Sequence, residues 1–84
     1  MARVIVYTFN YCPYCTWVKQ LLTERGVKFQ EIDITDNDEL REEVKQKSGR
    51  ITAPQVFINN KPIGGYEEVK KVKNSGELDH LLKE

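Results

Sequence analysis

The stretch RVIVYTFNYCPYCTWVKQLLTE, residues 3–24, joins an apolar segment to an amphipathic one through a pair of cysteines. Residues 3–8 are rich in β-branched and aromatic side chains, which predicts a largely buried strand. Residues 13–24 predict a helix, because apolar side chains recur at helical spacing at Val18, Leu21 and Leu22. Pro13 suits the first helical position, where its missing N–H costs nothing. Gly26 marks the end of this helix.

The rest of the chain continues to alternate between the two periodicities. We predict further strands at residues 27–34, 55–58 and 61–63, and helices at about 36–47, 66–73 and 77–82. Asp36 with Glu39 has the spacing of a capping box, which predicts the start of the second helix. Gly49 ends that helix, and Asn59 with Asn60 predicts a tight turn between the last two strands.

The predicted order of elements is βαβαββα, with the last helix split in two. A strand–helix–strand unit requires a parallel, right-handed connection, whereas the hairpin near the end of the chain adds antiparallel strands. The sequence therefore predicts an α/β fold, a four-stranded mixed sheet with helices on both faces. The chain has 84 residues, so we expect a single domain that spans residues 1–84.

The charge balance limits the classes of partner. Thirteen Lys and Arg residues oppose 13 Asp and Glu residues, which gives a formal net charge of zero. This balance removes the main electrostatic argument for a nucleic-acid or membrane-surface partner. The apolar run at residues 4–7 is too short for a signal peptide or a membrane span. We expect a monomeric, cytoplasmic protein.

The chain has two cysteines, Cys12 and Cys15. One local pair is not the multi-bridge framework of a small secreted protein. A complete zinc site needs about four ligands, and the one histidine, His80, lies near the other end of the chain. We therefore predict no metal site, with a zinc half-site shared with a second chain as a minor alternative. The two thiols are expected to react with each other or with an outside thiol.

The motif Cys12-Pro13-Tyr14-Cys15 lies where the first strand meets the first helix. In that context, within a strand–helix–strand unit, a CxxC motif indicates a redox active site. Cys12 falls at the N-cap, where unpaired N–H groups and the helix dipole favour the thiolate, the attacking species. Cys15 lies one turn inside the helix and should be more buried. We predict Cys12 as nucleophile and Cys15 as resolving thiol; the alternative is a pair of ordinary buried cysteines.

Other features have two interpretations when the residues alone are considered. Pro54 begins the third strand as either a turn proline or a cis proline that exposes the backbone of Ala53, and chain physics does not favour the cis form. The glycines before Tyr66 form either a plain turn or a helix start that binds a carboxylate. Arg41 is either an exposed helix residue or a ligand contact. For Trp17 we favour a packing role.

Several segments together resemble a dithiol glutaredoxin of the CPYC type. They are YTFNYCPYC (7–15), the second strand ending in Asp33, SGRITAPQVFI (48–58) and IGGYEE (63–68). They span nearly the whole chain in the family's order. The resemblance implies a thioredoxin-like fold with a cis Pro54 and glutathione as the electron donor, with no permanently bound cofactor.

The resemblance also implies a glutathione site with the sulfur of the ligand at Cys12. The implied contacts are Tyr14, Arg41, Thr52, Ala53, Pro54, Gly65, Tyr66 and Glu67. Ala53 would pair with the cysteinyl backbone, and Arg41 would meet the glycine carboxylate. The start of the helix at Gly65 would meet the γ-glutamyl end, and Glu67 or Glu68 its ammonium group.

Three positions differ from the usual family pattern. Phe9 stands where many dithiol glutaredoxins carry a lysine that helps to hold the thiolate and the glycine carboxylate. Ala53 replaces the usual valine, and Glu67 with Glu68 replaces the usual pair of aspartates. No catalytic atom is lost by these changes.

The expected function is glutathione-dependent reduction of protein disulfides and of protein–glutathione mixed disulfides. The first alternative is a redoxin that takes electrons from thioredoxin reductase and donates them to ribonucleotide reductase. The IGGYEE segment and the tyrosine within CPYC argue against it. A second alternative is a glutathione-ligated iron–sulfur carrier that uses Cys12 from two subunits. The availability of Cys15 for oxidation argues against that role.

Overall fold

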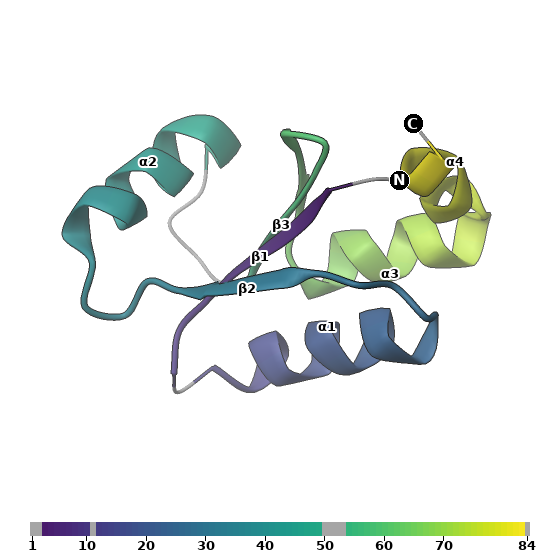
Figure 1. The fold of residues 1–84 in the computed structure, drawn as a ribbon, viewed down its shortest axis with the longest axis horizontal. Coiled ribbons are helices and arrows are strands. Elements are labelled where there is room, and N and C mark those ends of the chain that lie inside the picture. Colours follow the sequence, from purple (N-terminus) through teal and green to yellow (C-terminus); the bar gives the residue numbers. More distant parts are fainter. Residues whose placement is uncertain (1–2, 11, 50–53, 84) are drawn as a thin grey trace.

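The computed structural model describes residues 3–10, 12–49 and 54–83. Its elements in chain order are β1 (Val4–Thr8), α1 (Pro13–Glu24), β2 (Gln30–Asp33), α2 (Asp38–Ser48), β3 (Gln55–Ile58), β4 (Lys61–Gly64), α3 (Tyr66–Ser75) and α4 (Glu77–Lys83) (Figure 1). The strands form one sheet in the order β2-β1-β3-β4. β1 and β2 are parallel, and the β1–β3 and β3–β4 pairs are antiparallel. The predicted mixed α/β sheet is confirmed.

Helices cover both faces of this sheet (Figure 1). On one face, α1, α3 and α4 pack on the sheet through Val4, Val6, Val18, Leu21, Leu22, Val56, Ile58, Val69 and Leu78. On the other face, α2 packs through a smaller cluster of Tyr7, Ile34, Val44 and Phe57. Successive residues of a strand point to opposite faces, so the alternation along β1 and β3 supplies both clusters. Even-numbered residues of β1 therefore face α1.

Helix α1 carries the cysteine pair and is held on the sheet by its predicted apolar stripe. Val18 and Leu22 have no exposed surface, and Leu21 is 7% exposed. Pro13 is the first residue of the helix and Cys12 is its N-cap. After Glu24 the helix ends at Arg25, and Gly26 follows with a φ of +72°. The predicted helix and its end are confirmed.

Two local predictions are wrong in detail. The N-cap of α2 is Asn37, whose side chain accepts a hydrogen bond from the backbone N–H of Leu40 at 3.0 Å. Asp36 therefore lies one residue before the cap, and the predicted capping box with Glu39 does not form. The second strand is also shorter than residues 27–34, because the N–H of Val27 donates to Leu22 O and completes the end of α1.

The last part of the chain follows the prediction closely. Asn59 and Asn60 have φ values of +51° and +68°, which is the geometry of a tight hairpin turn. Gly76 has a φ of +84° and separates α3 from α4. Among the residues that the structure describes, no helix is long and apolar enough to cross a membrane.

Candidate active site

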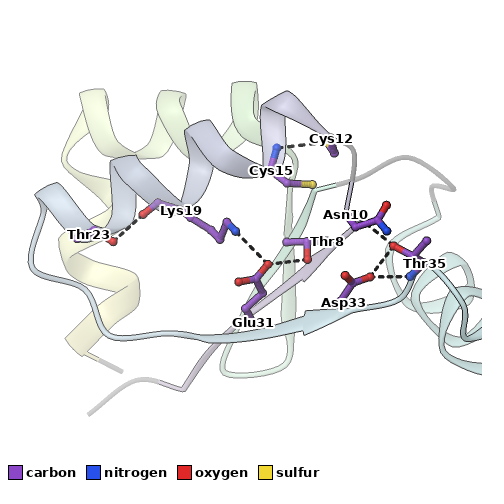
Figure 2. A network of polar contacts seen from close by, with 9 residues as sticks. All are labelled: Thr8, Asn10, Cys12, Cys15, Lys19, Thr23, Glu31, Asp33 and Thr35. Carbon is purple, nitrogen blue, oxygen red and sulfur yellow. Dashed lines mark hydrogen bonds and ion pairs between the residues drawn. The ribbon is translucent and has the colours of Figure 1, made fainter.

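Cys12 follows β1 in the chain and is the N-cap of α1, with φ −102° and ψ 112°. Its Sγ accepts a hydrogen bond from the backbone N–H of Cys15 at 3.2 Å (Figure 2). The side chain is partly exposed, and both cysteines are free thiols. An N–H aimed at sulfur stabilises a thiolate more than a thiol, because hydrogen bonds to a charged acceptor are stronger. The predicted capping position of Cys12 is confirmed.

Cys15 is almost fully buried, with 2% of its surface exposed, as expected. Burial and the hydrogen bond to Cys12 raise the pKa of Cys15 from 9.0 to about 12. A backbone hydrogen bond with Phe9 and the positive charge of Lys19 act in the opposite direction and lower the pKa. The two thiols therefore differ in access, and Cys15 remains protonated at neutral pH.

We expect iodoacetamide to modify one cysteine, Cys12, in the reduced protein at pH 7. Cys15 should react only as pH rises toward 12, because the thiolate is the reactive form and burial disfavours it. An unfolded chain releases this proton first, so folding stability should also fall as pH rises from about 9 toward 12. Peptide mass spectrometry of the labelled protein measures both sites.

The control for this labelling is the Cys12→Ser variant, which at pH 7 should take up reagent only after denaturation. Equal labelling rates at the two cysteines of the native protein would contradict the assigned difference in access.

Three aromatic rings gather beside the cysteine pair. The ring of Tyr14 lies 5.1 Å from that of Trp17 and 6.2 Å from that of Tyr66, and Trp17 lies 5.8 Å from Tyr66. Tyr14 and Trp17 are about half exposed, at 49% and 48%. Trp17 therefore has the predicted packing role, but it packs against two tyrosines at the surface and not in the core.

This aromatic cluster borders a groove between α1 and α3. The groove has a volume of about 380 Å³ and is lined by Trp17, Gln20, Leu21, Glu24, Tyr66, Lys70, Lys73 and Asn74. Most of its lining side chains are polar, whereas the core cluster beneath it is apolar. The groove therefore extends the surface around Tyr14 along the two helices.

The start of α3 lies close to the proline that precedes β3. Gly65 is the N-cap of α3, and a side-chain carbon placed there would lie 3.2 Å from the carbonyl oxygen of Pro54. Pro54 is buried. Glu68 accepts a hydrogen bond from the N–H of Gly65 at 3.3 Å, whereas Glu67 is exposed in the first turn. The structure thus brings Tyr14, Pro54, Gly65 and Tyr66 into one region.

Arg41 of α2 is exposed, and its guanidinium carbon lies 5.2 Å from the centre of the Phe9 ring. Its Nη1 also lies 3.9 Å from a carboxylate oxygen of Asp38. A cation over an aromatic face is favourable by about 0.5–1 kcal/mol at exposed sites. Phe9 therefore contacts an arginine from another element near the end of β1.

Two of the predicted contact residues, Thr52 and Ala53, lie outside the described residues. The peptide bond that joins Ala53 to Pro54 also falls outside them, so the cis form of Pro54 remains a prediction. Among the described residues, no group of three or more His, Cys, Asp or Glu side chains could hold a metal ion.

Sequence reasoning missed a polar network beneath α1 (Figure 2). Lys19 donates to Glu31 Oε2 at 3.0 Å, and the hydroxyl of Thr8 donates to the same oxygen at 2.9 Å. Thr8 is 1% exposed. The sequence did contain one indication that Lys19 lies near the cysteine pair. Lys19 follows Cys15 by four residues, which places both on the same face of a helix.

Comparisons with known proteins identify relatives across the whole chain. The family model described as glutaredoxin matches residues 4–63. The chain is 47% identical to glutaredoxin 3 of Escherichia coli K12 over 83 residues, covering 99% of this chain and 100% of that protein. It is 43% identical to a glutaredoxin of Pseudomonas aeruginosa, with 98% of each chain covered.

Solved structures show the same fold. The solution structure of a Brucella melitensis glutaredoxin superposes with a TM-score of 0.88 at 44% identity, covering 99% of this chain and 90% of that one. A buckwheat glutaredoxin–glutathione complex also gives a TM-score of 0.88, at 30% identity, covering 98% of this chain and 77% of that one. These matches confirm the predicted thioredoxin-like architecture.

Proposed function

This chain belongs to the glutaredoxin family and is a thiol–disulfide oxidoreductase, and we propose that glutathione is its electron donor. We further propose that its substrates are protein disulfides and protein–glutathione mixed disulfides. The observation that carries the proposal is the N-cap position of Cys12, with the Cys15 N–H directed at its sulfur at 3.2 Å. This partly exposed sulfur is the group that an incoming disulfide would meet.

The proposed reaction begins with attack of the Cys12 thiolate on a glutathionylated protein. The bond between Cys12 Sγ and the sulfur of glutathione forms, and the protein thiolate leaves and takes a proton from water. A second glutathione thiolate then attacks the glutathione sulfur, which releases glutathione disulfide and restores the Cys12 thiolate. One free glutathione is therefore consumed for each mixed disulfide, and the released glutathione disulfide joins it to the glutathione that came from the substrate.

A protein disulfide follows a route that uses both thiols. Cys12 attacks one sulfur of the substrate, and Cys15 then attacks Cys12 to form the Cys12–Cys15 disulfide. The thiolate of the substrate leaves, and glutathione later reduces the disulfide within the motif. The burial of Cys15 suits this order, because the buried thiol meets Cys12 but not an outside reagent.

We propose that the tripeptide lies across the surface from Arg41 to the start of α3. Arg41 would bind the glycine carboxylate, and its contact with Phe9 supports this by holding the guanidinium near the active-site end of β1. Ala53, together with Thr52 and Pro54, would pair with the cysteinyl backbone. The complex of buckwheat glutaredoxin with glutathione supports the choice of ligand.

At the other end of the ligand, the first-turn N–H groups of α3 would bind the γ-glutamyl carboxylate, because they have no partner within the helix. Gly65 and Tyr66 supply this helix start, and Tyr14 covers the site between the two ends. Glu67 is the better placed acid for the ammonium group, since Glu68 already accepts the N–H of Gly65. We propose the cytosol as the compartment, since its glutathione pool keeps thiols reduced.

A coupled assay on a small mixed disulfide with glutathione tests the electron donor. One arm supplies glutathione, glutathione reductase and NADPH, and the other supplies thioredoxin reductase and NADPH. We expect turnover in the glutathione arm alone. Turnover only in the thioredoxin reductase arm would overturn the proposal and support the alternative redoxin role.

The same glutathione-coupled assay can be run with the Arg41→Gln variant, which removes the proposed contact with the glycine carboxylate. The concentration of glutathione needed for half-maximal rate should rise several-fold, in line with the loss of a charge-assisted hydrogen bond. Lys45→Gln, at an exposed position of the same helix, is the matched control and should leave that concentration unchanged.

A further inference from the structure

Three side chains from three elements form a connected polar network on the face of the sheet that α1 covers. Thr8 comes from β1, Glu31 from β2 and Lys19 from α1 (Figure 2). Val6 lies opposite Glu31 in the parallel ladder, and Thr8 is two residues further along β1, so both polar side chains share the face of Val6. Lys19 and Cys15 lie four residues apart on α1 and are directed toward this same face (Figure 2).

The network holds the ammonium group of Lys19 in place. Its Nζ lies 3.0 Å from Glu31 Oε2, and that oxygen also accepts the hydroxyl of Thr8 at 2.9 Å. Thr8 is buried, whereas the Lys19 and Glu31 side chains keep 32% and 40% of their surface exposed. A lysine on a helix surface normally samples many rotamers, so the hydrogen bond to Glu31, whose carboxylate is itself held by Thr8, restricts the Lys19 side chain to the sheet-facing side of α1 (Figure 2).

The charged and titratable groups around Cys15 have opposing effects on its pKa. Cys12, one turn earlier, raises the pKa of Cys15, and Lys19 is the cation that lowers it. Lys19 in turn faces the carboxylate of Glu31 and also acts on the more distant Asp33. Burial has the largest effect on the pKa of Cys15, and among the described residues Lys19 is the cation that opposes it.

We propose that Lys19, held by Glu31 and Thr8, is a positioning residue for the resolving step, where it stabilises the negative charge that develops on Cys15. In that step Cys15 releases its proton to water and its thiolate attacks Cys12 Sγ of a mixed disulfide. The Cys12–Cys15 bond forms, and the substrate or glutathione sulfur leaves with the electron pair and takes a proton from water. Lys19 stays protonated throughout, and the step needs no further oxidant or reductant.

This role rests on the proposed function, because a mixed disulfide must first form on Cys12. The test therefore starts from protein whose Cys12 has been converted to the glutathione adduct with glutathione disulfide, and follows release of glutathione by mass spectrometry. The glutathione that leaves when the adduct forms is removed before release is followed, and no free glutathione is added, so only Cys15 can release the ligand. Failure of the adduct to form on Cys12 would count against the proposed function and would be seen before any effect of Lys19 is measured.

We expect Lys19→Gln to slow release of glutathione roughly tenfold at pH 7, which corresponds to about one pKa unit in the resolving thiol. Lys19→Arg keeps the charge and should retain most of the rate. Lys28→Gln, an exposed lysine just before β2, is the matched control and should leave the rate unchanged. An unchanged rate in Lys19→Gln would overturn the proposal.

A second readout separates electrostatics from a structural role. Release of glutathione from the Cys12 adduct should speed up as pH rises and Cys15 ionises, and Lys19→Gln should move that pH profile upward by about one pH unit. In a Cys15→Ser background, turnover with added glutathione proceeds through Cys12 alone and should not respond to Lys19→Gln. Equal slowing with and without Cys15 would show that Lys19 acts through the fold or through Cys12 and would overturn the proposal.

Discussion

Replacing Cys12 by serine is expected to reduce turnover in the glutathione-coupled assay by a factor on the order of 10³ or more. A serine hydroxyl at this N-cap can still accept the N–H of Cys15, but it forms no alkoxide at neutral pH and no disulfide. The reaction then loses its nucleophile while the cap of α1 is kept. The measurement is the initial rate of NADPH oxidation with a mixed disulfide of glutathione as substrate.

Cys15→Ser is the matched control for this loss, because it makes the same replacement of sulfur by oxygen three residues further along the chain. We expect it to keep turnover within about threefold of the original protein, since the single-thiol route uses only Cys12. Its activity on a protein disulfide should fall, because release from that mixed disulfide needs the second thiol. If Cys15→Ser lost as much activity toward the glutathione mixed disulfide as Cys12→Ser, the assignment of nucleophile and resolving thiol would be wrong.

Replacing Gly64 by alanine is expected to destabilise the protein by about 3 kcal/mol, from backbone strain and overpacking together. Gly64 has a φ of +124°, a region that side chains rarely adopt. A methyl group there would also lie 2.8 Å from Cγ and Oε1 of Glu68 and 2.9 Å from its Cβ. Glu68 would have to move, which would break its hydrogen bond with the N–H of Gly65 at the start of α3.

Urea unfolding followed by circular dichroism measures this loss, and a fall in Tm of ~15 °C should accompany it. Gly76→Ala is the control, because Gly76 also has a positive φ, +84°, but among the described residues no atom beyond its chain neighbours lies within 4 Å of the added carbon. It should cost about 1 kcal/mol, the cost of a left-handed backbone alone. Equal losses in the two variants would mean that contact with Glu68 contributes nothing at Gly64.

The overall fold could be predicted because its signals are local and repeated. The β-branched segment before Cys12, the apolar stripe of Val18, Leu21 and Leu22, and the Asn59–Asn60 turn each act over a few residues. The prediction of the N-cap of α2 was wrong, because two neighbouring residues can both cap a helix. Asp36 and Asn37 both have capping side chains, and the structure uses Asn37, whose side chain reaches the N–H of Leu40.

The candidate site was predictable to a different extent for each residue. Cys12 and Cys15 are neighbours in the chain, so the helix start alone determines which thiol is the cap and which is buried. The proximity of Pro54 to Gly65 was implied only by the resemblance to glutaredoxins, and it requires β3 and α3 to meet. The exposure of Trp17 was not predictable, because helical periodicity shows the centre of an apolar stripe more clearly than its edges.

The sequence by itself determined the family, the order of strands and helices, and the cysteine pair at the start of α1. Those features depend on side-chain periodicity and on capping, which act within one or two helical turns. The contact of Arg41 with Phe9 and the network of Lys19, Glu31 and Thr8 were decided only by the tertiary structure. These groups come from different elements and are far apart in sequence, and the parallel pairing of β1 and β2 beneath α1 brings the members of the network together.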